Sequence, residues 1–172
     1  MKLFEPLALK DSIEIKTTPE KIWNFFYNLE KNYKAWHPED HVSFKWTKGK
    51  PMETGSHWYA GEYIFGELKK GKGTIGEVIP NRKIVFKNAF PVSIVFSRFE
   101  WLIEPKDSKS VFTAVSYIRA EKIMRKLASV FHSSDKKNLD TIIAAGKKHV
   151  KEEGENLKKI LETGNREEEI EL

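Results

Sequence analysis

The sequence predicts a single α+β domain in which a curved antiparallel sheet of about six to seven strands wraps around a long C-terminal helix. Three observations lead to this prediction: an alternating segment that runs into a capped helix, a series of alternating segments separated by glycines and prolines, and a long amphipathic segment at the end. Because the links between the middle segments are short, we expect hairpins rather than crossover connections.

The first strand and helix are predicted by local signals. Residues 12–16 alternate between apolar and polar side chains, which is typical of a short strand. Thr18, Pro19 and Glu20 follow, and together they supply a capping hydroxyl, a proline for the first turn and an early acidic residue. Residues 22–29 then provide the apolar face of a helix.

The middle of the chain is predicted to be a meander of antiparallel strands. Residues 33–41 mix aromatic, proline and charged residues without a clear period, and they indicate either a loop or a short second helix. The alternating segments that follow are residues 42–47, 56–68, 72–79, 83–88, 92–104 and 110–119.

The last third changes to a helical period. Residues 123–131 fit a short amphipathic helix, and Ser133-Ser134-Asp135 offers a second cap. The long helix that begins there is expected to end at Gly164. We therefore predict one domain over residues 1–163 with an internal cavity, followed by an acidic, disordered tail over residues 164–172.

Composition excludes several classes of function. The 172 residues include no cysteine, which excludes disulfides, thiolate metal sites and a cysteine nucleophile. Lys plus Arg number 30 and Asp plus Glu 25, a net charge of +5, and residues 1–150 alone carry 26 basic against 17 acidic side chains, or +9. We find no nucleic-acid recognition motif and, near the start, no apolar run for a signal peptide or a membrane span. We therefore expect a cytoplasmic protein.

Two short segments combine histidines with carboxylates. The segment from Trp36 to His41 reads WHPEDH, and its proline restricts His37 to an extended or turn conformation. On the long helix, His149 and Glu153 are one turn apart, and Glu153 falls inside the apolar arc of the helical wheel. A carboxylate buried there needs a partner, a proton or a metal ion, unless the helix already emerges into solvent at this point.

Two further parts of the chain bear on the site: a glycine of the long helix and a strand with two glutamates. Gly146 lies on the same inner arc of the long helix, where it either leaves room for a ligand or allows close packing. Glu62 and Glu67 fall on opposite faces of an aromatic-rich strand, and only one face lines the cavity. We favour Glu62, which lies mid-strand beside a glycine, because Glu67 adjoins two lysines with which it can pair in solvent.

The sequence resembles a known superfamily and one enzyme family within it. The segment Ile13-x-Ile15-x-Thr17-Thr18-Pro19-Glu20-x-Ile22-Trp23 resembles the opening of the START-related, Bet v 1-like (SRPBCC) proteins, which have the helix-grip fold. Tyr33-x-x-Trp36-His37-Pro38-x-Asp40-His41, the Gly55 and Glu62 strand, and His149-x-x-x-Glu153 resemble the metal-binding pattern of the 2,4-diacetylphloroglucinol hydrolase and phloretin hydrolase family.

This resemblance implies a metal site and an activity. Its implied ligands are His37, Glu62, His149 and Glu153, with His41 as the alternative to His37, and its implied cofactor is zinc or another divalent transition metal. Imidazole and carboxylate ligands suit such ions. The implied reaction is hydrolysis of the carbon–carbon bond between an acyl group and a phenolic ring.

We therefore predict a metal-dependent hydrolase that acts on a small aromatic or polyketide-like ketone. The alternative is a non-enzymatic carrier of an apolar molecule in the same cavity. Four aromatic side chains of the strands are the candidates for contacting the substrate ring: Trp58, Phe86, Phe96 and Trp101.

Overall fold

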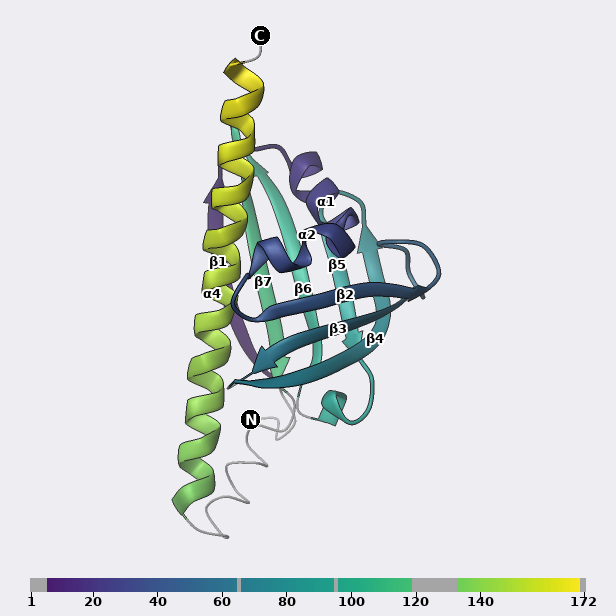
Figure 1. Cartoon of the computed structure of the whole chain (residues 1–172), viewed down its shortest axis with the longest axis vertical. Helices are drawn as coiled ribbons and strands as arrows, with labels where there is room; N and C mark the ends of the chain where they lie inside the picture. Colours follow the sequence, from purple (N-terminus) through teal and green to yellow (C-terminus); the bar gives the residue numbers. More distant parts are fainter. Residues whose placement is uncertain (1–5, 65, 95, 119–132, 171–172) are drawn as a thin grey trace.

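The computed structural model describes residues 6–64, 66–94, 96–118 and 133–170 of the chain. They form one seven-stranded antiparallel sheet, three α-helices and one 3-10 turn (Figure 1). The elements are β1 (Leu7–Ile15), α1 (Pro19–Tyr27), α2 (Leu29–Trp36), β2 (His41–Lys48), β3 (His57–Ile64), β4 (Glu67–Ile79), β5 (Lys83–Asn88), η1 (Val92–Ile94), β6 (Phe96–Lys106), β7 (Lys109–Ile118) and α4 (Ser133–Ile170).

The sheet has the meander topology that the sequence predicts. Its strand order is β1-β7-β6-β5-β4-β3-β2, so every pair from β2 to β7 is a hairpin between consecutive strands. β1 closes the sheet by pairing with β7, from Leu7 opposite Ile118 to Ile15 opposite Ser110. The curved sheet and long C-terminal helix confirm the helix-grip α+β class. None of the described helices combines the length and the apolar composition that crossing a membrane requires.

Several boundaries differ from the predictions. The segment 56–68, predicted as one strand, contains the whole of β3 and the start of β4, because Gly66 adopts a φ of +77° and reverses the chain. The predicted start of the next long strand at Val92 is a 3-10 turn, and β6 begins at Phe96. Residues 33–36 belong to a second helix, as one of the two alternatives proposed. The predicted helix at 123–131 lies outside the described residues.

The long helix also extends further than predicted. It does not end at Gly164 but continues to Ile170, so residues 164–170 are helical rather than a disordered tail. Glutamate and arginine are good helix formers, and the cost of about 1 kcal/mol for one glycine does not end a helix of this length.

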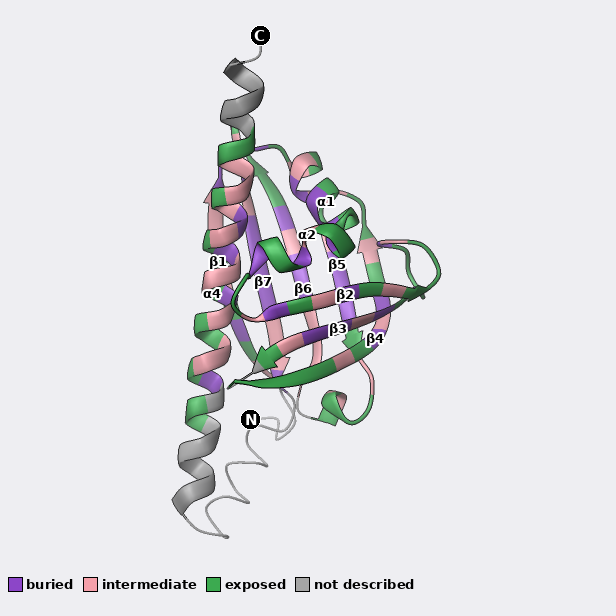
Figure 2. Ribbon diagram, in the orientation of Figure 1, coloured by how far each residue is buried: buried purple, intermediate pink, exposed green. Residues whose placement is uncertain are grey.

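A layer of aromatic side chains packs between the helices and the sheet. Figure 2 shows buried positions on α1, on α2 and on the strands of the sheet. Phe26 of α1 stacks on Trp101 of β6 with ring centroids 4.1 Å apart, and Trp36 of α2 contacts both rings edge-on. Phe86 of β5 lies 4.5 Å from Trp101 on the sheet side. These contacts position the C-terminal end of α2, where the histidine-rich segment begins.

Helix α4 runs alongside β1 in the same direction (Figure 1). Gly146 faces Leu9, Gly154 faces Ile13, and the Glu162 carboxylate accepts a hydrogen bond from the backbone N–H of Lys16. From Leu9 to Lys16 the strand rises about 23 Å, and from Gly146 to Glu162 the helix rises about 24 Å, so the two elements stay in step. Of the two roles proposed for Gly146, the structure shows close packing.

We predict that alanine at the helix glycines separates helix propensity from packing. Gly154→Ala should raise the free energy of unfolding by about 0.5–1 kcal/mol, because the new methyl group makes only an ordinary 3.4 Å contact with Ile13. Gly146→Ala should gain less, because its methyl group meets Leu9 at 3.1 Å. Urea denaturation measures both changes. Gly164→Ala, with no neighbour within 4 Å, is the control, and an equal gain at Gly146 would contradict close packing there.

Candidate metal centre

Three histidines and three carboxylates meet where the α2–β2 connection crosses α4. The connection is short and restrained, because the backbone N–H of His41 donates to the carbonyl of His37 at 2.8 Å. The buried Trp36 joins this connection to α4 by donating its indole N–H to the backbone carbonyl of Glu153 at 2.8 Å. Hydrogen bonds to backbone groups therefore hold the connection that carries His37 and His41 against the helix that carries His149.

His41 has one ring nitrogen anchored and the other free. Its Nδ1 lies 3.0 Å from the carbonyl oxygen of Tyr33, and since a carbonyl only accepts, Nδ1 carries the proton. The Tyr33 ring stacks on the imidazole with centroids 4.0 Å apart. The buried Nε2 has no hydrogen-bond partner among the described residues and lies 3.3 Å from Oε1 of Glu153.

His149 is oriented in a similar way from the opposite element. Its Nδ1 lies 3.2 Å from Oδ2 of Asp40, and its Nε2 lies 3.6 Å from the same Oε1 of Glu153. The Asp40 carboxylate therefore fixes which ring nitrogen of His149 faces Glu153. Two imidazoles thus direct their Nε2 atoms at one carboxylate oxygen while a carbonyl and a carboxylate hold their Nδ1 atoms. Metal-binding histidines are usually supported in this way.

Glu153 is the carboxylate on which the cluster converges. Its side chain is only 12% exposed, so it faces inward, as its place on the helical wheel predicts. Burial alone would raise its pKa, but the adjacent charge of His149 and contacts with both imidazoles hold the pKa at about 2. Burial alone would lower the pKa of His149, but Glu153, Glu62 and Asp40 raise it to about 10. In the absence of metal, an ionised carboxylate is therefore paired with a protonated imidazole.

The spacing of these atoms fits one transition-metal ion. Two ligand atoms that each lie about 2.0–2.1 Å from a zinc ion at a tetrahedral angle are about 3.3 Å apart. The two Nε2–Oε1 distances, 3.3 Å from His41 and 3.6 Å from His149, are close to that value. The three ligand atoms all lie within 4.8 Å of one another, so the residues present fit the ion.

His37 lies beside this group but makes different contacts. Its Nδ1 accepts the backbone N–H of Asp40 at 3.3 Å, and its Nε2 lies 3.5 Å from Oε2 of Glu152. His37, Asp40 and His149 form a second group with ligand atoms within 4.8 Å of one another. The sequence favours His37 over His41 as the ligand beside Glu153, whereas the structure brings His41 to Glu153.

Glu62 reaches the cluster through a tyrosine. It lies opposite His41 in the β2–β3 register and accepts a hydrogen bond from the Tyr33 hydroxyl. Burial, followed by the Glu62 charge, raises the pKa of Tyr33 well above its ordinary value, so the phenol stays protonated and donates. Glu67, by contrast, is exposed and pairs with Lys69. Sequence reasoning assigned no role to Tyr33 or Asp40, although both lie in the motif that carries the family resemblance.

The predicted substrate-contacting aromatics pack against each other or lie elsewhere. Trp58, Phe86 and Trp101 are buried in the main core, with Phe86 in contact with both tryptophans. Phe96 packs instead on a smaller group with Leu9. Within the described part of the chain, Trp58, Phe86 and Trp101 therefore pack in the core and do not line an open cavity.

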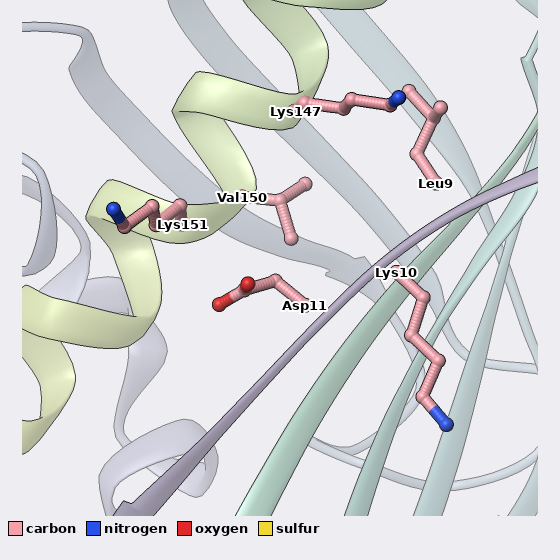
Figure 3. A pocket seen from close by; sticks show the side chains of 6 residues that line it. All are labelled: Leu9, Lys10, Asp11, Lys147, Val150 and Lys151. Atoms are coloured by element: carbon pink, nitrogen blue, oxygen red, sulfur yellow. The ribbon is translucent and has the colours of Figure 1, made fainter.

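A hollow of about 200 Å³ lies elsewhere, between β1 and α4 (Figure 3). Asp11 points toward the helix there, whereas Lys10 points away from it. The remaining lining residues are Leu9, Lys147, Val150 and Lys151, and none belongs to the histidine cluster. This hollow therefore adds nothing to the metal centre.

Comparisons with known proteins identify the fold. No protein-family model and no curated sequence matches the chain. Among solved structures, the Polyketide_cyc-like protein of Corynebacterium glutamicum superposes with a TM-score of 0.64 at 15% identity, covering 93% of this chain and 94% of that one. The ZhuI aromatase/cyclase of Streptomyces sp. R1128 superposes with a TM-score of 0.68 at 10% identity, covering 92% and 94%.

A third structure, the di-domain ARO/CYC protein StfQ of the steffimycin biosynthetic pathway, has a TM-score of 0.72 at 11% identity. The match covers 94% of this chain but 52% of StfQ, about half of that protein. At such identities the likenesses establish the helix-grip fold expected from the START-related resemblance. The resemblance to the hydrolase family stays a prediction.

We predict that neutralising the two adjacent glutamates of α4 has unequal effects on stability. Glu153→Gln should lower the free energy of unfolding of metal-free protein by about 2 kcal/mol, because it leaves a buried protonated imidazole without its anion. Glu152→Gln, at a more exposed side chain, should cost less than about 1 kcal/mol. Urea denaturation in chelator measures both, and equal costs would argue against an inward-facing ion pair at Glu153.

Proposed function

We propose that this protein is a metal-dependent hydrolase whose ion is held by His41, His149 and Glu153. The observation that carries the proposal is the convergence of two imidazole Nε2 atoms on one buried carboxylate oxygen, with both Nδ1 atoms anchored. Two nitrogen ligands and one oxygen ligand suit zinc, and the chain offers no thiolate.

A three-residue set also suits catalysis better than the four-residue set expected from the resemblance. Catalytic zinc sites keep three protein ligands and leave the fourth position to water or substrate. Glu62 accepts a hydrogen bond from Tyr33 and is therefore not a metal ligand in this proposal. It remains close to the centre as a carboxylate that can accept a proton from an attacking water.

The ion and the residues of the chain would make separate contributions to the reaction. When bound, the ion would polarise a ketone oxygen and lower the pKa of a water molecule toward neutrality. The Tyr33 carbonyl and the Asp40 carboxylate hold the two imidazoles in the tautomer that presents Nε2. Tyr33 also donates a hydrogen bond from its hydroxyl to Glu62, and this bond orients the Glu62 carboxylate.

The proposed substrate is a small aromatic or polyketide-like ketone, cleaved at the carbon–carbon bond between its acyl group and phenolic ring. The motifs shared with the 2,4-diacetylphloroglucinol hydrolase and phloretin hydrolase family support this class. The structural neighbours ZhuI and StfQ are named as aromatase/cyclases, enzymes that form aromatic rings, so this fold accommodates molecules that acquire such rings.

We predict that the protein binds one zinc ion and that His41, rather than His37, is required. His41→Ala, His149→Ala and Glu153→Gln should each abolish stoichiometric zinc, because each removes one of three ligands. His37→Ala should retain it. Metal analysis after purification without chelator, followed by calorimetric titration with zinc, measures both quantities. His57→Ala, at an exposed histidine on β3, is the control.

Two outcomes would contradict this assignment. Loss of zinc in His37→Ala with retention in His41→Ala would place the ion in the His37, Asp40 and His149 group instead. Absence of zinc uptake by the wild type would leave the cluster as an ion-pair network and favour the non-enzymatic carrier. In that case chelator should not change the melting temperature, whereas it should lower the melting temperature of a metalloprotein.

We further predict that Asp40 acts by orienting His149. Asp40→Asn should weaken zinc affinity by about 10- to 100-fold while leaving the stoichiometry at one, because the ligands remain but His149 loses its anionic partner. Hydrolysis of an acylphenol, followed by acid release, should fall in parallel at limiting zinc and recover at saturating zinc. An activity loss that excess zinc does not restore would assign Asp40 a different role.

A further inference from the structure

The connection between β5 and β6 exposes large apolar side chains. Phe90 is 74% exposed and Ile94 56% exposed, which makes them the two most exposed large apolar side chains of the described residues. Val92 lies between them and is exposed as well. Figure 1 shows that η1, which this connection forms, projects from the sheet on the side away from α4. Exposed apolar side chains gathered in one place usually mark a binding surface.

We call the exposed residues Phe90, Val92 and Ile94 the apolar tip, and lysines border it. A hollow of about 260 Å³ is lined by Phe90, Pro91 and Val92 on one side and by Lys70 and Lys72 of β4 on the other. The tip is fixed to β4, because the backbone N–H of Ala89 donates to the carbonyl of Lys72 at 2.8 Å. Tyr59, directly opposite Lys72 in the β3–β4 register, completes the same face. Among the residues that the structure describes, no acidic side chain lines this hollow.

We propose that this tip docks on the surface of a membrane containing anionic phospholipids. Apolar side chains that project from a surface can enter the headgroup boundary, while adjacent lysines pair with anionic headgroups. The charge of residues 1–150, 26 basic against 17 acidic side chains, favours approach to such a surface. The tip and the metal centre share no residue, so this proposal does not rest on the proposed function.

The test is binding to vesicles of phosphatidylcholine with and without phosphatidylserine, measured by co-sedimentation. The wild type should bind the anionic vesicles at low salt and be released at high salt. Replacing Lys70 and Lys72 with glutamine should weaken binding about fivefold for each lysine. Phe90→Ser combined with Ile94→Ser should weaken it about tenfold or more, because both side chains lose their apolar contact with lipid.

Matched controls separate the tip from the rest of the surface. Lys31→Gln with Lys34→Gln removes two exposed lysines of α2, and Tyr27→Ser removes an exposed aromatic of α1. Both should bind like the wild type. Inorganic phosphate at matched ionic strength should not displace the protein, since a free anion offers nothing to the apolar tip.

Several results would overturn the proposal. One is wild-type protein that stays in the supernatant with anionic vesicles at low salt. Another is tip variants that melt at the wild-type temperature and bind as well as the wild type. A third is a concentration-dependent dimer abolished by Phe90→Ser with no vesicle binding, which would assign the tip to a second copy of the chain.

Discussion

The ionised side chain of Glu153 is the constraint on which the arrangement of the centre depends. A buried carboxylate is costly unless a partner neutralises it, and here the protonated imidazole of His149 does so while His41 contacts the same oxygen. The backbone carbonyl of Glu153 also accepts a hydrogen bond from the indole N–H of Trp36. Glu153 thus links α4 to the end of α2 through Trp36 and to the start of β2 through His41, and a displacement of α4 would break both contacts together.

The inward direction of Glu153 and the elements that carry the site are predictable from sequence, because local physics decides them. The spacing of apolar residues along α4 fixes which face is buried, and an i, i+4 pair on that face must share it. The Thr18 cap behaves as expected, accepting the backbone N–H of Lys21 at 3.4 Å. Strand β5 has the predicted bounds, because alternation and flanking turn residues both mark them.

Sequence does not decide whether His37 or His41 is the ligand beside Glu153. Both lie in one short segment, and what separates them is the partner of each Nδ1. His41 meets a carbonyl eight residues earlier, at Tyr33, while His37 meets the backbone N–H of Asp40. These contacts depend on how α2 ends and β2 begins. The aromatic layer is a similar case, since strand alternation gives the face of Trp58, Phe86 and Trp101 but not whether a cavity remains between them.

The exposure of the cluster indicates from which side the centre is reached. His41 is fully buried against Tyr33 on the core side, whereas His149 and Asp40 are partly exposed on the side of α4 and the α2–β2 connection. Exposure therefore rises from the aromatic layer toward the surface. Because the core aromatics are in contact with one another, the cluster is open to solvent from that polar side. The packed interior holds the imidazoles in place.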